Sequence, residues 1–157
     1  MSSKFARAVA SAGGLGYLPV APGTAGSLVG WLLGMGWPVR DAAALHILAF
    51  GLLVVVGLAA STIAERASGL HDPGWIVIDE VLGMWLVLLL VPSAVGIGWQ
   101  AVLAFALCRI FDIAKPPPLK WLSRFPGGWG IVLDDVGAGV YAALALWGLA
   151  LLLNRPG

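Results

Sequence analysis

The fold is decided by one stretch, residues 42–64, which reads AAALHILAFGLLVVVGLAASTIA. It contains no charged residue, and its one titratable side chain, His46, lies near its start. Coiled as an α-helix, the stretch would be roughly 33 Å long, which is enough to cross the hydrocarbon core of a bilayer. It therefore predicts a membrane-spanning helix.

The composition of the whole chain leads to the same conclusion. Of its 157 residues, 60% are hydrophobic and 11% are charged, and the mean hydropathy is +0.95. A soluble domain carries about 25% charged residues, so a soluble or disordered chain is excluded. The net charge of +1 and the single cysteine, Cys108, exclude a nucleic-acid-binding protein and a disulfide framework. We expect one integral-membrane domain over residues 1–157.

Three further apolar segments are predicted to cross the membrane as helices: residues 75–91, 98–113 and 131–153. An earlier segment, residues 27–39, is short, so it crosses only if its helix begins further upstream, and otherwise it is re-entrant. Gly26, Gly30 and Gly34 recur there at intervals of four residues, which indicates close helix packing. The predicted fold is an all-α, polytopic transmembrane bundle of four to five helices.

The distribution of lysine and arginine predicts the orientation of this bundle. With five crossings, one side carries seven basic residues: Lys4, Arg7, Arg66, Arg109, Lys115, Lys120 and Arg124. The opposite side carries only Arg40 and Arg155. Because short cytoplasmic loops are enriched in basic residues, the first side is predicted to face the cytoplasm.

Acidic residues gather on the same predicted side. Six of the eight lie at or just inside helix ends there: Asp72, Asp79, Glu80, Asp112, Asp134 and Asp135. A carboxylate inside a spanning helix is costly unless it is paired or binds a metal. The adjacent pairs Asp79–Glu80 and Asp134–Asp135 are therefore candidate metal ligands, and an all-oxygen ligand set suits Mg²⁺.

Possible partners of a phosphate group accompany these acids. Arg109 and Asp112 are three residues apart on one helix face, and Arg109 can bind a phosphate with two parallel hydrogen bonds. Lys115 adds a point charge, and His71 is a candidate proton carrier. Each of these features, considered alone, has a simpler explanation. Arg109 and Asp112 could form an ion pair at a helix end, and His71 could be an ordinary loop residue.

A glycine-containing turn, residues 21–27 (APGTAGS), leads into the first apolar segment. Its backbone N–H groups at a helix start would attract an anion, and Thr24 or Ser27 could cap the helix. It lacks the Gly-Lys-Ser/Thr end of a Walker A loop. The simpler alternative is a turn followed by an N-cap.

Four blocks in this order carry a resemblance to a known family. They are residues 21–27, His71-Asp72 with Asp79-Glu80 and Gly83-Met84-Trp85, residues 109–116 (RIFDIAKP), and Gly127-Gly128-Trp129-Gly130 with Asp134-Asp135 and Gly139. No single block is diagnostic, but the ordered set is specific and covers residues 13–141. The chain resembles the phosphatidylglycerophosphatase A family of bacterial membrane enzymes.

This resemblance implies Mg²⁺-dependent removal of the terminal phosphate from phosphatidylglycerol phosphate, at the cytoplasmic face of the inner membrane. The phospholipid and the membrane would be the partners, with no nucleic acid. We assign the residues accordingly: metal ligands Asp79, Glu80, Asp134 and Asp135; catalytic residues His71, Asp72, Arg109, Asp112 and Lys115; and substrate-binding residues Thr24, Ser27, Arg109 and Lys115. Direct attack by water is favoured, because a DxDx(T/V) nucleophile motif is absent.

Two other functions are weighed against the phosphatase. A cation transporter could use the carboxylates as its pathway, but these cluster at one predicted end and the sequence shows no internal repeat. An enzyme similar to the CDP-alcohol phosphotransferases would also be rich in carboxylates. The sequence lacks the D-G-x-x-A-R segment that such an enzyme needs. The sequence leaves open the oligomeric state and the number of metal ions.

Overall fold

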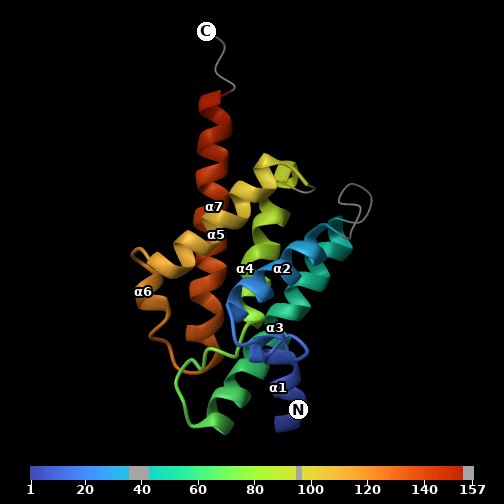
Figure 1. Cartoon of the computed structure of the whole chain (residues 1–157), viewed down its shortest axis with the longest axis vertical. Coiled ribbons are helices and arrows are strands. Elements are labelled where there is room, and N and C mark those ends of the chain that lie inside the picture. Colours follow the sequence, from blue (N-terminus) through green and yellow to red (C-terminus); the bar gives the residue numbers. More distant parts are fainter. Residues whose placement is uncertain (36–42, 95–96, 154–157) are drawn as a thin grey trace.

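The computed structural model describes residues 1–35, 43–94 and 97–153, and every regular element within them is helical (Figure 1). The α-helices are α1 (Ser3–Ala10), α2 (Pro22–Met35), α3 (Ala43–Ser68), α4 (Ile78–Leu90), α5 (Trp99–Ala114), α6 (Leu119–Leu122) and α7 (Gly128–Leu153). Two short 3₁₀ turns, η1 (Leu15–Tyr17) and η2 (Pro92–Ala94), complete the set. The all-α prediction is confirmed.

Within these described ranges, two helices are long and apolar enough to cross a membrane, Ala44–Ser68 and Gly128–Leu153. Only 22% and 28% of their most apolar windows are buried inside the protein, whereas the core helix of a soluble protein would be mostly buried. Leu48 and Leu52, for example, are 68% and 64% exposed. This exposed apolar surface indicates association with a membrane.

Helix α4 is shorter than the sequence suggested. It begins at Ile78 rather than at residue 75, and its 13 residues span about 20 Å, less than the ~30 Å hydrocarbon core. Helix α2 begins at Pro22, upstream of the predicted start, and has 14 residues. Four to five crossings therefore stay a prediction. Residues 36–39 of the predicted segment 27–39, together with Arg40 and Arg155, lie outside the described residues.

Helix α4 is the centre of the bundle, and glycines bring its two neighbours close. On one side α2 packs through Gly26, Gly30 and Gly34, and a Cβ on Gly30 would overlap the carbonyl of Val81. The close packing predicted from the four-residue spacing is confirmed. On the other side α7 approaches Gly83, where a Cβ would lie 2.7 Å from the Asp135 carbonyl oxygen.

Helices α1 and α6 were not predicted. Helix α1 packs against α3 and buries Ala6 and Ala10, while Arg7 lies 5.8 Å from the ring centre of Trp75. Helix α3 also holds the start of α7: the hydroxyl of Thr62 accepts a hydrogen bond from the Gly128 N–H at 2.8 Å. These contacts fix the end of the bundle at which the chain begins (Figure 1).

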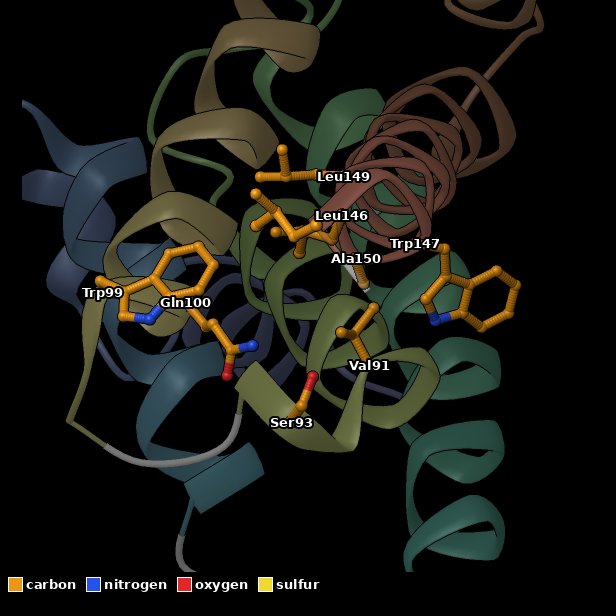
Figure 2. Close-up of a pocket in the computed structure, with 9 residues that line it drawn as sticks. Val91, Ser93, Trp99, Gln100, Leu146, Trp147, Leu149 and Ala150 are labelled. Carbon is orange, nitrogen blue, oxygen red and sulfur yellow. The ribbon is translucent and has the colours of Figure 1, made fainter. Parts of the chain in front are cut away.

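A cavity of about 120 Å³ lies at the opposite end, among η2, the start of α5 and the last turns of α7 (Figure 2). Its lining is apolar apart from Ser93 and Gln100. Leu146, on its wall, is eleven residues beyond Asp135, which is about 16 Å along α7. This cavity therefore lies well away from the carboxylates.

Candidate active site

Three carboxylates from two helices converge beside α4. Asp79 and Glu80 occupy the first turn of α4, and Asp135 lies on α7, where its backbone closely approaches Gly83 of α4. One oxygen from each of the three lies within 4.8 Å of the others. Asp79 is 8% exposed and Asp135 is 4% exposed, so the cluster is largely shielded from solvent.

Two oxygens of this cluster are left without a partner. Asp79 Oδ1 and Glu80 Oε2 are buried and accept no hydrogen bond within the described structure. Buried carboxylate oxygens that repel one another are stable only if they share protons or bind a cation. The three side chains thus fit a hard divalent cation such as Mg²⁺, which binds carboxylate oxygens.

Asp134, the fourth predicted metal ligand, lies outside this cluster. Its Oδ2 forms an ion pair with the ammonium group of Lys115, and its Oδ1 accepts a hydrogen bond from the Asp135 N–H at 3.1 Å. Burial alone would lower the pKa of Lys115, but the hydrogen bond and charge of Asp134 outweigh it, so this pKa is raised. Lys115 is therefore a cation at neutral pH, beside the carboxylates as predicted.

Arg109 joins three helices at the edge of the cluster. Its Nη1 lies 2.8 Å from Asp112 Oδ2 on the same helix, α5, and 3.7 Å from Glu80 Oε1 on α4. The same nitrogen donates to the Ser27 hydroxyl on α2 at 3.4 Å. The helix-end ion pair with Asp112 therefore exists, but it also places a guanidinium group next to the candidate metal ligands.

The segment at residues 21–27 forms the start of α2. Because Pro22 is already the first residue of the helix, the prediction that Thr24 or Ser27 caps it is wrong. Ser27 is buried, and its hydroxyl donates to the Gly23 carbonyl at 3.1 Å while it accepts from Arg109. Thr24 is exposed on the preceding turn. Of the two, Ser27 is the one that the structure brings to the site.

His71 and Asp72 lie in the exposed turn between α3 and α4. His71 Nδ1 is 2.7 Å from Glu65 Oε1, and the Asp72 N–H donates to the same oxygen at 3.2 Å. Asp72 interacts electrostatically with Asp79 and with Lys115. The turn therefore borders the site, with His71 held on its outer side.

Glu65 is a residue that the sequence analysis missed. It lies in the last turn of α3, ahead of Gly69, which has a positive φ of 70° where the chain turns back. A carboxylate near a helix end can reach the amides and side chains of the turn that follows. The glycine after the helix was the signal that could have identified it.

The combined arrangement is suited to a phosphate ester. Carboxylates that can hold a divalent cation lie next to Arg109 and Lys115, the two kinds of side chain that bind phosphate oxygens. Together they would neutralise the charge of a phosphoryl group during its transfer.

Comparisons with known proteins agree with this chemistry. The family model described as phosphatidylglycerophosphatase A matches residues 8–150. Relatives named phosphatidylglycerophosphatase A, from Haemophilus influenzae and Escherichia coli, are each 38% identical. Their alignments cover 87% and 85% of this chain and 83% and 77% of the relatives.

A Bacteroides thetaiotaomicron protein, whose name is "Putative phosphatidylinositol-3-phosphatase", is 39% identical over 85% of this chain and 89% of its own length. No solved structure matches the chain. The family match covers all of the residues that form the site, from Gly23 to Asp135. The chain therefore belongs to the phosphatidylglycerophosphatase A family.

Proposed function

We propose that this protein is a Mg²⁺-dependent phosphatase that removes the terminal phosphate of phosphatidylglycerol phosphate. The observation that carries the proposal is the cluster of Asp79, Glu80 and Asp135. Two of its buried oxygens, Asp79 Oδ1 and Glu80 Oε2, have no partner among the described residues, and Glu80 Oε1 lies 3.7 Å from Arg109 Nη1. Membership of the family and the names of two relatives support this substrate. They also favour a phosphatase over a transporter or a phosphotransferase.

The three clustered carboxylates would hold the cation. When bound, Mg²⁺ supplies positive charge that polarises phosphoryl oxygens and favours deprotonation of water. Arg109 would bind the phosphate through its fork of N–H groups, held in place by Asp112 and Ser27. A guanidinium fixed in this way stabilises the charge that builds up in the transition state.

The remaining predicted residues have supporting roles in this proposal. Lys115, oriented by Asp134, would neutralise a further phosphate oxygen. His71, whose Nδ1 faces Glu65, retains Nε2 to take up or release a proton as a general acid or base. Asp72 would adjust the charge around the ligands, and Thr24 would contact the headgroup. A role for Asp134 as a fourth ligand stays a prediction.

We further propose that the protein crosses the bacterial inner membrane several times, with the site at the cytoplasmic face. The exposed apolar surfaces of α3 and α7 support a membrane location, and the basic residues of the sequence support the orientation. Single cysteines placed at Lys120 and Arg124 in a cysteine-free background should react with a membrane-impermeant thiol reagent only after the cells are opened. Labelling in intact cells would contradict this orientation.

The decisive experiment measures phosphate release from phosphatidylglycerol phosphate by the purified protein in detergent. EDTA should abolish release and Mg²⁺ should restore it. Glu80→Gln and Asp135→Asn should each lower kcat/KM by at least about 100-fold, since each removes a ligand charge. Lys120→Gln, at an exposed cation that is not part of the site, is the matched control and should retain activity. Activity near the wild-type level in either carboxylate variant would contradict the assignment of the site.

One relative suggests a second substrate. Because the Bacteroides thetaiotaomicron protein is named for phosphatidylinositol 3-phosphate, that lipid should be assayed in parallel at the same surface concentration. Both lipids carry a phosphomonoester on a polar headgroup, and the cluster with Arg109 would treat the ester in the same way. Preference for the inositol lipid would overturn the choice of substrate while leaving the metal site intact.

A further inference from the structure

An apolar groove of about 170 Å³ separates α2 from α5. Leu28 and Trp31 of α2 form one wall, and Ala101, Val102 and Phe105 of α5 form the other. Leu28 and Val102 are 46% and 70% exposed, so the groove is open to the outside of the bundle. Helix α2 packs chiefly against α4, and α5 packs chiefly against α7, so the two walls contact each other only slightly.

One end of the groove lies next to two residues of the candidate active site on the same two helices. Ser27 directly precedes Leu28 on α2, and Arg109 lies about one helical turn beyond Phe105 on α5. The hydrogen bond from Arg109 to Ser27, 3.4 Å long, bridges the two walls at this end. From that bridge the groove extends along α5 to Ala101, eight residues or about 12 Å away from Arg109.

We propose that this groove holds an acyl chain of the lipid whose phosphate is bound at Arg109. The proposal rests on the function proposed above. A phosphomonoester lipid has an anionic head joined to a long apolar chain, and the protein presents a guanidinium group joined to an apolar groove. A bulk zwitterionic lipid could occupy the apolar part, but it lacks the doubly charged phosphate that would fix it at the polar end.

Water-soluble substrates isolate the contribution of the groove. Phosphate release is measured for the deacylated headgroup and for the dihexanoyl lipid, both kept below micelle-forming concentrations. Burying one methylene group should raise kcat/KM roughly fourfold. If the groove buries three, kcat/KM should be about 60-fold higher for the dihexanoyl lipid than for the deacylated headgroup. Val102→Trp, which fills the groove, should lower this ratio below about fivefold, mainly through KM for the acylated substrate.

A matched control uses the same change at an apolar residue outside the groove. Leu52→Trp, on the exposed face of α3, should keep the wild-type ratio. The proposal is overturned if Val102→Trp keeps the ratio, or if Leu52→Trp lowers it equally. If the wild-type protein releases phosphate from neither substrate, the proposed function is wrong, and the groove is then judged by binding alone.

The binding measurement uses lipids with brominated acyl chains, which quench tryptophan fluorescence on contact. The signal of Trp31 is the difference between the wild type and Trp31→Phe, both in detergent micelles. Brominated phosphatidic acid, a phosphomonoester lipid, should quench this signal more than brominated phosphatidylcholine at equal mole fraction. Val102→Trp should remove the difference, with the Trp31 signal in that variant taken against Val102→Trp combined with Trp31→Phe. Equal quenching by the two lipids in the wild type would show bulk lipid in the groove and overturn the proposal.

Discussion

Gly23, at the start of α2, allows a test of the site, because a substitution there should displace site side chains without destabilising the fold. A Cβ at this position would overlap Glu80 Oε1 and would lie 3.0 Å from Arg109 Nη2. Both atoms are the far ends of flexible side chains, so Gly23→Ala can be accommodated by moving them. To regain ordinary contact, the Glu80 carboxylate must withdraw by roughly 1 Å, and displacements of about 1 Å in an active site can cost ~100-fold in rate.

We therefore expect Gly23→Ala to lower kcat/KM for phosphate release by about 100-fold and to raise the Mg²⁺ concentration needed for half-maximal activity. Thermal unfolding in detergent should change little, because alanine is favoured over glycine within a helix by up to about 1 kcal/mol. The assay is phosphate release as a function of Mg²⁺ concentration, alongside the melting temperature of the same preparation.

Two other glycines provide the controls. Gly30→Ala, on the same face of α2, places its Cβ against the backbone of Val81 and should cost about 1–3 kcal/mol of stability through overpacking. Gly51→Ala, on α3, meets nothing within 4 Å and should keep both activity and stability. Full activity of Gly23→Ala, or a loss of stability as large as that of Gly30→Ala, would refute the placement of Glu80 beside α2.

Three more changes test the surroundings of the site. Lys115→Gln leaves the buried Asp134 unpaired and should lower the free energy of unfolding by about 2 kcal/mol. This is less than for a fully buried ion pair, because Lys115 is partly exposed. Because the pKa of Lys115 is raised above 10.5, this loss should be constant at neutral pH and shrink only in unfolding experiments above about pH 10. Thr62→Val removes the acceptor of the Gly128 N–H and should lower the free energy of unfolding by about 1–2 kcal/mol; an unchanged melting temperature would contradict that contact. Ser27→Ala should lower kcat/KM about fivefold without a change in stability, since it removes one hydrogen-bond acceptor, at 3.4 Å, of the charged Arg109 guanidinium.

The helices with long apolar runs could be predicted from the sequence, while the local packing could not. From residue 43 onward, where the structure describes it, the predicted run 42–64 lies inside α3, and the predicted 131–153 lies inside α7. An unbroken apolar sequence leaves few alternatives to a helix. The predicted start of α4, Trp75, is three residues too early. The residues on both sides of the true start are apolar, so the composition does not mark where the turn ends and the helix begins. Helix α1 has too few apolar residues to resemble a spanning segment.

For the site, the residue types were predictable, but the partner of each one was not. The sequence offers Asp134 and Asp135 as equal candidates, yet neighbours on a helix point about 100° apart. The direction of α7 relative to α4 decides that Asp135 faces Asp79, while Asp134 faces Lys115. That direction is set by long-range contacts between helices, which do not appear as a local pattern.

The glycine contact between α4 and α7 has a consequence for how the protein would bind the proposed Mg²⁺. Gly83 lies one turn beyond Asp79 and Glu80, and its close approach to the Asp135 carbonyl ties the two ligand-bearing backbones together by packing. The candidate ligands are thus positioned before any cation binds, and the binding free energy would go to charge neutralisation rather than to ordering the chain. A metal-free preparation should therefore remain folded and be reactivated within the mixing time of added Mg²⁺, without a slow refolding phase.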